Sequence, residues 1–464
     1  MRPMQPNAAA DKPPSRSAAD FRKPSTNRLV LLVGFLLPLA LDVKKVGDEG
    51  GSALQILLVA ISLLCGAVYF MAEWLSRDIR SAGSALRTMT ALWWTYIVLS
   101  PLPILLWGVD PVHYLKVLLP YVLFGAGLSV MVAVERQRVD PAALLDILLW
   151  ACLLSTVWRV LYAIAIGGLS IEAIRWQILG PGVPFLIGYG VGGLYLRRRR
   201  ALSAIALSIG LAVVLLAVTR SYIISAAFVL AGLLIVDSRR RSALRAAKTG
   251  ARLFVLLVVI TAIAMILTDA VRPAFLEVWF ARLFHHQAEG GLDISLITRL
   301  AEFKGQLEGF TRNPGTFVFG NGIGADYTWD AQLLQQLPFQ YEHDTRWFAG
   351  HSTWVYPFFA GGLILGLLIP LVVLGGLLRA FTAASISATK YRSRDAVLVL
   401  TVYLAYVGQS FTANLFHERY TGMILGILVG VSLIYAARVR AAKVRRPTMA
   451  TNHKNWGGFT WITK

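Results

Sequence analysis

The segment from Val112 to Val134, VHYLKVLLPYVLFGAGLSVMVAV, decides the fold class of this chain. Its only charged side chain is that of Lys116, and most of its other residues are apolar. A helix needs about 20 mainly apolar residues to cross the hydrocarbon layer of a bilayer. The segment is therefore predicted to be a membrane-spanning helix.

Comparable apolar runs recur throughout the chain, which has 464 residues, 56% of them hydrophobic and 15% charged. That is too little polar surface for a soluble fold. Lipid offers no partners to backbone N–H and C=O groups, and the runs lack the alternation of barrel strands, so helices are expected. The prediction is an all-α polytopic membrane protein with about twelve transmembrane helices, at 29–41, 53–75, 88–107, 112–134, 144–166, 183–196, 201–218, 221–236, 253–268, 353–378, 396–413 and 420–436.

The net charge of +20 arises from basic clusters that occupy alternate loops. Loops rich in Lys and Arg stay on the cytoplasmic side of a membrane. The distribution argues against nucleic acid as a partner and places both termini in the cytoplasm. The clusters include Arg22 and Lys23, Arg77 and Arg80, Arg197 to Arg200, Arg239 to Arg241, Arg392 and Arg394, and Arg438 and Arg440.

The chain divides into five parts under this topology. Residues 1–28, rich in Pro, Ser, Ala and basic residues, are expected to form a disordered cytoplasmic tail. Transmembrane helices one to nine occupy 29–267, and helices ten to twelve occupy 353–436. A large loop, 268–352, lies between them on the outer face, and 437–464 forms a second cytoplasmic tail.

The loop 268–352 contains more acidic than basic residues, so it should face outward and cap the bundle. Within it, a helix is predicted from Ile294, with a stripe of apolar residues at helical spacing, as in a helix that lies on the membrane interface. Arg299, Glu302 and Gln306 fall outside this stripe. The stripe consists of Ile297, Leu300, Phe303, Leu307 and Phe310.

Two breaks follow this helix. Asn313-Pro314-Gly315 ends it, and Gly320-Asn321-Gly322-Ile323-Gly324 is expected to form a tight turn. The glycines lack the spacing of a dinucleotide-binding loop and have no strand before them, so close backbone packing is the better interpretation. Cys65 and Cys152 both fall inside predicted spans, which argues against a disulfide framework.

Four motifs, taken in order, resemble the O-antigen ligase and polymerase superfamily over about residues 200–370. They are Thr219-Arg220-Ser221, Arg299 ahead of Asn313-Pro314 and the glycine turn, Gly350-His351-Ser352, and Phe359-Ala360-Gly361-Gly362-Leu363-Ile364-Leu365-Gly366. By this resemblance Arg220 and Arg299 match the family's functional arginines, and His351 matches its functional histidine. The family histidine is usually followed by Asn, and Ser352 stands in that place here.

The resemblance implies a glycosyltransferase at the periplasmic face of the bacterial inner membrane, acting in lipopolysaccharide biosynthesis. Its donor would be a glycan on undecaprenyl diphosphate. A ligase passes that glycan to a sugar of the lipid A core, and an O-antigen or exopolysaccharide polymerase passes it to a second lipid-linked glycan. A direct attack would invert the anomeric configuration, and no metal or other cofactor is expected.

The residue types suit this chemistry on physical grounds. Guanidinium groups can fork onto diphosphate oxygens, and fixed cations stabilise the charge that grows on a departing diphosphate. An imidazole such as that of His351 can accept the proton of an acceptor hydroxyl. His343 is a rival for this role, and Arg159, Arg175 and Ser352 are further candidate substrate contacts.

Plainer interpretations remain beside these. Arg220 can be a snorkelling residue at a helix end, Arg299 a solvated position, and His351 a structural hydrogen-bonding residue. His285-His286 invites a metal site, but adjacent histidines do not share a helix face.

A transporter of an anionic or lipid-linked solute is the alternative from another functional class. It predicts charged residues at the middle of several spans, and Lys116 is the one point in its favour.

Overall fold

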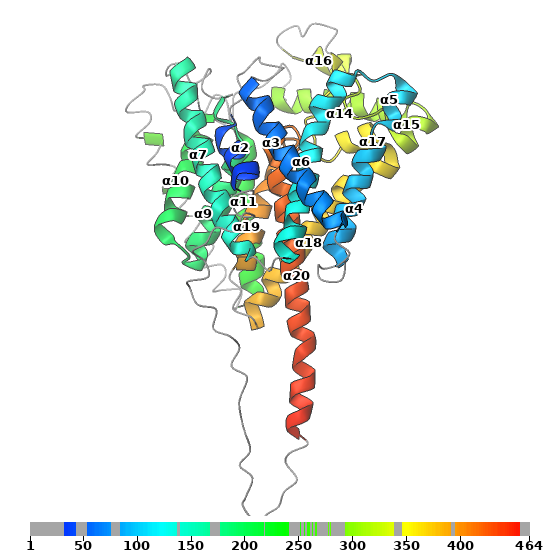
Figure 1. The fold of residues 1–464 in the computed structure, drawn as a ribbon. Coiled ribbons are helices and arrows are strands. Elements are labelled where there is room, and N and C mark those ends of the chain that lie inside the picture. Colours follow the sequence, from blue (N-terminus) through cyan, green and yellow to red (C-terminus); the bar gives the residue numbers. More distant parts are fainter. Residues whose placement is uncertain are drawn as a thin grey trace, which may run out of the picture.

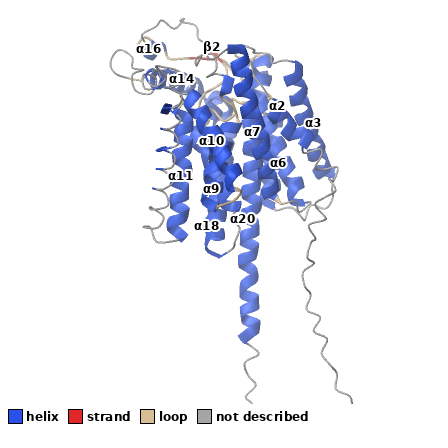
Figure 2. Ribbon diagram, turned by 90° about the vertical axis from the view of Figure 1, so that its left-hand side faces the viewer, coloured by secondary structure: helices blue, strands red, loops and turns tan. Residues whose placement is uncertain are grey.

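The computed structural model describes residues 32–42, 53–75, 84–136, 140–167, 177–217, 219–240, 293–337, 346–390 and 395–454, and isolated positions between 251 and 279. Within this part the chain is mostly helical, and its one sheet is a short antiparallel pair formed by β1 (Tyr327–Thr328) and β2 (Arg346–Trp347). Figures 1 and 2 show upright helices gathered into one bundle. The all-α membrane class is therefore confirmed.

The first half of the bundle contains a π-helical turn followed by α-helices. They are η2 (Leu32–Leu36), α2 (Leu37–Leu41), α3 (Ala53–Leu75), α4 (Ser84–Leu99), α5 (Leu102–Trp107), α6 (Pro111–Arg136), α7 (Pro141–Gly167), α9 (Gly182–Leu196), α10 (Arg200–Ala217) and α11 (Arg220–Arg240). The second half contains α14 (Ile294–Thr311), α15 (Pro314–Phe319), α16 (Ala331–Leu334), α17 (Tyr356–Gly366), α18 (Leu368–Lys390), α19 (Asp395–Ser410) and α20 (Arg419–Lys454).

Among the described residues, seven helices are long and apolar enough to cross a membrane. They are Ser84–Trp107, which joins α4 to α5, and the apolar parts of α6, α7, α10, α11, α18 and α20. Shorter apolar helices lie within α3 and at α9, α17 and α19. The predicted span 253–268 falls almost wholly outside the described residues, so the total of about twelve stays a prediction.

The predicted span 353–378 is not one helix. The chain forms α17 and then α18, separated at Leu367, and within α17 Gly362 has φ 63° and ψ −163°. Only glycine adopts that backbone conformation readily. Hydropathy shows one continuous apolar run here, whereas the backbone bends at Gly362, where α17 packs against the end of α15.

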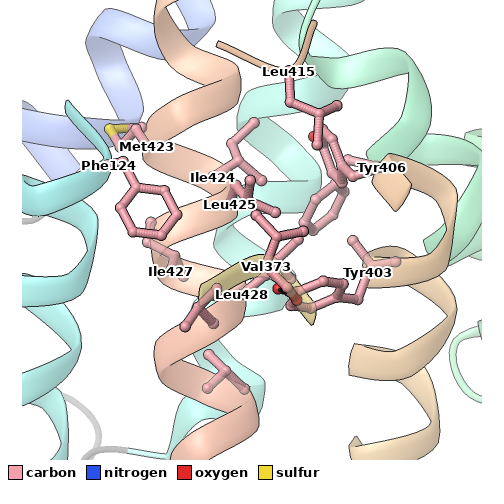
Figure 3. Packing of buried hydrophobic residues seen from close by; sticks show 14 of the residues in the cluster. Phe124, Val373, Tyr403, Tyr406, Leu415, Met423, Ile424, Leu425, Ile427 and Leu428 are labelled. Atoms are coloured by element: carbon pink, nitrogen blue, oxygen red, sulfur yellow. Dashed lines mark hydrogen bonds between the residues drawn. The ribbon is translucent and has the colours of Figure 1, made fainter. Parts of the chain in front are cut away.

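The centre of the bundle is the contact between α6 and α20. Gly422 and Gly426 of α20 lie directly against the backbone of Pro120 and Phe124 of α6, where a Cβ atom would collide with carbonyl oxygens. Small residues allow this close approach of membrane helices. Figure 3 shows Phe124 beside the α20 side chains, with Tyr403 of α19 and Val373 of α18 on the other side.

The last helix extends into the predicted cytoplasmic tail at 437–464. It continues without interruption from Arg419 to Lys454, well beyond the predicted span. Residues 437–446 are rich in Ala, Arg and Lys, which are strong helix formers. Figure 1 shows this extension projecting from one end of the bundle, which we call the tail end.

The described residues between 293 and 355 form a cap at the opposite end of the bundle (Figures 1 and 2). The predicted helix of this loop is α14, but its predicted apolar stripe is divided. Ile297 is fully buried, while Leu300, Phe303 and Leu307 are 44%, 43% and 43% exposed. The face turned into the protein instead carries Glu302, which is buried.

Candidate functional site

The carboxylate of Glu302 lies at the centre of the cap, and its side chain is 4% exposed. Oε1 accepts hydrogen bonds from the Tyr327 hydroxyl at 2.7 Å, from Gln306 Nε2 at 3.1 Å and from the backbone N–H of His351 at 2.7 Å. Oε2 lies 3.1 Å from His351 Nδ1 and 3.5 Å from an Arg299 guanidinium nitrogen. Every one of these partners is polar or cationic, as a buried carboxylate requires.

Burial alone would raise the pKa of the Glu302 carboxyl, because it disfavours the charged form. The hydrogen bond and charge of His351 and the hydrogen bond of Tyr327 outweigh burial, so this pKa lies below its ordinary value of 4.5. The pKa of the Tyr327 phenol is raised by its own burial and by the neighbouring Glu302 charge. At neutral pH, therefore, Glu302 is an anion and Tyr327 is a hydrogen-bond donor to it.

His351 is held by Glu302 but remains 28% exposed. With a carboxylate as its partner, Nδ1 carries the proton in the neutral imidazole, and Nε2 is left as the hydrogen-bond acceptor. Its ring lies parallel to that of Trp347, with centroids 5.6 Å apart and planes 9° apart. The rings of His417 and Trp329 lie at 5.9 Å and 6.4 Å.

Local backbone contacts fix His351 in this place. In the β1–β2 pair Tyr327 lies opposite Trp347, so one short strand pair positions both the donor to Glu302 and the ring beside His351. Asn414 Nδ2, in the loop between α19 and α20, donates to the Gly350 carbonyl at 2.7 Å. The segment before His351 is thus bound to the cap on one side and to the bundle on the other.

The glycine turn packs closely against α17; the sequence predicts close backbone packing but not this partner. The backbone N–H groups of Asn321 and Gly322 donate to the carbonyls of Phe359 and Ala360, each at 2.9 Å. Gly320 has φ 79° and faces the backbone of Gly362, with no room for a Cβ atom on either residue. Two motifs that are separate in the sequence therefore form one contact, and this contact positions α15 and the end of α14.

The two predicted arginines are both linked to α14. Arg299 lies on that helix, 43% exposed, beside Glu302. Arg220, the first residue of α11, forms a 2.6 Å ion pair with Asp293, which also caps the start of α14 by accepting from the Leu296 N–H at 3.1 Å. The structure brings Arg299 together with His351 at Glu302 and ties Arg220 to the start of the same helix.

Arg159 lies inside the bundle, and its guanidinium is already occupied by partners within the protein. It lies 3.2 Å from the Asp42 carboxylate and donates to the Leu179 carbonyl at 2.6 Å, and its side chain is only 3% exposed. Glu418 is 4.0 Å away. These contacts favour a structural role over the predicted carrier contact.

The Ser352 hydroxyl accepts from the backbone N–H groups of Trp354 and Val355 at 3.3 Å and 3.2 Å, at the turn that leads into α17. An Asn at this position could accept the same bonds, because Ser and Asn both satisfy backbone donors in turns. Ser352 therefore has a local hydrogen-bonding role in this turn. Arg175, His343 and the pair His285-His286 lie outside the described residues.

Sequence reasoning did not assign Glu302, Tyr327, Trp347 or His417 to the site. A signal existed for Glu302, since it is three residues after Arg299 on a helix otherwise rich in apolar residues. In the part of the chain described above, no group of three or more His, Cys, Asp or Glu side chains could hold a metal ion. The groups available are an imidazole, a buried carboxylate, guanidinium groups and aromatic rings.

No protein-family model matches the chain. No curated protein matches it at a significant level either. Any functional conclusion therefore depends on the geometry of the cap and on the motif order in the sequence.

Proposed function

We propose that this protein is a glycosyltransferase that moves a glycan from undecaprenyl diphosphate to an acceptor sugar, in the manner of an O-antigen ligase. The observation that carries the proposal is the pair formed by Glu302 and His351. A buried anion that orients a partly exposed imidazole is a common arrangement for a general base. Arg299, beside the same carboxylate, adds a cation for the donor.

In this proposal Nε2 of His351 accepts the proton of the acceptor hydroxyl. The acceptor oxygen forms a bond to the anomeric carbon while the bond from that carbon to the diphosphate oxygen breaks, and the electron pair leaves with the diphosphate. Glu302 stabilises the imidazolium that results, as an oriented carboxylate does in catalytic triads. Attack from the face opposite the leaving group inverts the anomeric configuration.

The leaving diphosphate gains negative charge as the bond breaks, and Arg299 is positioned to stabilise it. A charge-assisted bond to a guanidinium is stronger in this transition state than in the ground state, so it accelerates the reaction. Arg220 contributes the second cation once the donor competes with Asp293 for it. A diphosphate is a good leaving group, and this reduces the need for a metal ion.

The proposed location is the bacterial inner membrane, with the cap on the periplasmic side and both termini in the cytoplasm. The basic run Arg197 to Arg200 lies at the turn between α9 and α10, at the tail end (Figure 1), and basic loops stay in the cytoplasm. The exposed apolar side chains of α14 support contact with membrane lipids at the interface. The undecaprenyl chain of the donor would remain in the bilayer.

The leading acceptor is a sugar of the lipid A core, and a second lipid-linked glycan, as used by a polymerase, is the alternative. The transporter hypothesis gains no support from Lys116. Its ammonium lies 5.9 Å from the ring centroid of Phe348 in the cap, at the end of α6 and not at mid-depth. A transporter would need charged groups along its path through the membrane.

The test is transfer by purified protein in proteoliposomes with an undecaprenyl-diphosphate glycan and EDTA. Lipid A-core and a second carrier-linked glycan are supplied separately, with His351→Ala as the inactive variant and Glu308→Gln as a matched surface control on α14. Transfer to lipid A-core that only His351→Ala abolishes supports a ligase, and chain extension supports a polymerase. No transfer to either acceptor with the native donor overturns the proposal and favours transport.

A further inference from the structure

A row of five ring side chains crosses the cap from the candidate site outward, and we call it the aromatic row. It runs through His417, His351, Trp347, Phe348 and His113. Successive ring centroids lie 5.9, 5.6, 6.1 and 3.9 Å apart, with interplanar angles of 23°, 9°, 24° and 8°. Every ring in it is at least partly exposed. The transfer mechanism uses only His351 of these five residues.

The far end of the aromatic row is polar. His113 Nδ1 lies 3.1 Å from the Asp326 carboxylate, and its Nε2 lies 3.9 Å from that of Asp110. Both carboxylates are about half exposed, at 44% and 49%, and His113 is 28% exposed. One cation, Lys116, sits over the Phe348 ring nearby. This end therefore presents hydrogen-bonding groups with two negative charges and one fixed positive charge.

The row is held rigidly by segments that are distant in sequence. The Tyr356 hydroxyl donates to the Phe348 carbonyl and accepts from the Gly324 N–H, each at 3.0 Å. Gly324, at φ 78°, packs against the backbone of His113 and Tyr114, where a side chain would not fit. A surface fixed in this way before any ligand arrives loses little entropy when it binds one.

We propose that the aromatic row binds the acceptor glycan, with uncharged sugar rings of the acceptor lying against Trp347 and against the edge of Phe348, one face of which the His113 ring covers at 3.9 Å. This inference rests on the proposed function, because His351, which takes the proton of the acceptor hydroxyl, is a member of the row. Sugar rings have C–H faces that pack on the negative faces of aromatic rings. Their hydroxyl groups are partners for carboxylates and imidazoles such as those of Asp326 and His113.

The charges at the far end of the aromatic row disfavour binding of the anionic donor. Asp326 and Asp110 would repel a diphosphate, while Arg299 and Arg220, on the α14 side, attract one. A neutral, hydroxyl-rich ligand meets no such repulsion at the far end of the row. The surface therefore suits the acceptor glycan and not the anionic part of the donor.

The experiment uses the full chain in detergent and a probe prepared from lipopolysaccharide: the core oligosaccharide released by mild acid and then dephosphorylated. Binding is measured by calorimetry without donor, for wild type, Phe348→Leu and Asp326→Asn. Phe411→Leu is the matched control, because Phe411 is a 58% exposed ring outside the row that packs near Trp354. Melting curves establish that each variant is folded.

We expect Phe348→Leu to raise the dissociation constant about tenfold and Asp326→Asn about threefold, with Phe411→Leu unchanged. Asp326→Asn keeps every ring and so remains informative if Phe348→Leu is unstable. In the transfer assay the same two variants should raise the KM for the acceptor and leave both the KM for the donor and kcat unchanged. No binding by wild type, or equal binding by all variants, overturns the inference.

The two proposals can fail separately. If wild type transfers the glycan but Phe348→Leu and Asp326→Asn leave the KM for the acceptor unchanged, the glycosyltransferase proposal is supported. The proposal that the aromatic row binds the acceptor is then contradicted. If the oligosaccharide binds in a way that depends on Phe348 but the protein transfers no glycan, the aromatic row is supported as a glycan-binding surface. The glycosyltransferase proposal is then contradicted.

Discussion

Glu302 and His351 are joined twice, although 49 positions separate them in the chain. One carboxylate oxygen of Glu302 accepts the His351 backbone N–H at 2.7 Å, and the other lies 3.1 Å from Nδ1 of its ring. The first contact fixes the backbone and the second fixes the ring, so neither can move without the other. This double attachment fixes the orientation of the imidazole ring, whose side chain is 28% exposed.

The same pair predicts how stability depends on pH. The folded-state pKa of Glu302 is below its ordinary value of 4.5, so the stability it contributes is complete above that pH and is lost as pH falls through the lower value. We expect the melting temperature of wild type to fall below about pH 4.5, and the fall to be smaller in Glu302→Gln. Glu308→Gln, exposed on the same helix, should keep the wild-type slope. Parallel curves for wild type and Glu302→Gln would contradict this.

Asp293→Asn should strengthen donor binding. Asn still caps α14 by accepting from Leu296, so the helix start is preserved, but the carboxylate that pairs with Arg220 is removed. An exposed ion pair contributes up to about 1 kcal/mol, so we expect the KM for the donor to fall about two- to fivefold. The KM is measured in the transfer assay. An unchanged or higher value would show that Arg220 does not meet the diphosphate.

Gly362→Ala should detach the cap from α17. Its backbone lies in a region that costs a side chain about 1–3 kcal/mol, and its Cβ would also meet the backbone of Val318 and Gly320. We expect a lower melting temperature and faster proteolysis of the cap. The control is Gly375→Ala on α18, where nothing lies near the new Cβ and helix propensity favours Ala. Equal effects of the two substitutions would contradict the packing described here.

A double variant can distinguish a structural role of Arg159 from a contact with the substrate. Arg159→Met leaves Asp42 buried without its cation, which should cost about 3–5 kcal/mol, and the double variant Asp42→Leu with Arg159→Met should recover most of it. Thermal unfolding in detergent measures both. If Arg159 instead binds the carrier, the double variant will be stable but will show a raised KM for the donor.

Much of the fold could be predicted because apolar length is a strong signal for membrane helices. The runs that became α6, α7 and α10 needed only composition. The bend at Gly362 could not be predicted, since the residues on both sides are equally apolar and hydropathy carries no information on φ and ψ. The contact of Gly320 with Gly362 imposes that bend.

The site was predicted in part. Motif order indicated Arg299 and His351, which the structure brings to one carboxylate. It did not indicate Glu302. The exposed Leu300 and Phe303 make α14 apolar on one side, and Ile297 makes it apolar where it is buried, so an amphipathic pattern alone does not tell which side faces the protein. The aromatic row was also missed. Its contact between His113 and Asp326 spans 213 positions of the sequence.

The most direct test of the central claim is a double-mutant cycle on transfer rate, with wild type, Glu302→Gln, His351→Ala and the double variant at saturating donor and acceptor. We expect His351→Ala to be slower by about 10²–10⁴-fold and Glu302→Gln to be impaired less. If Glu302 acts through His351, the double variant will be no slower than His351→Ala alone. Independent, multiplicative losses, or a wild-type rate in His351→Ala, would contradict the account.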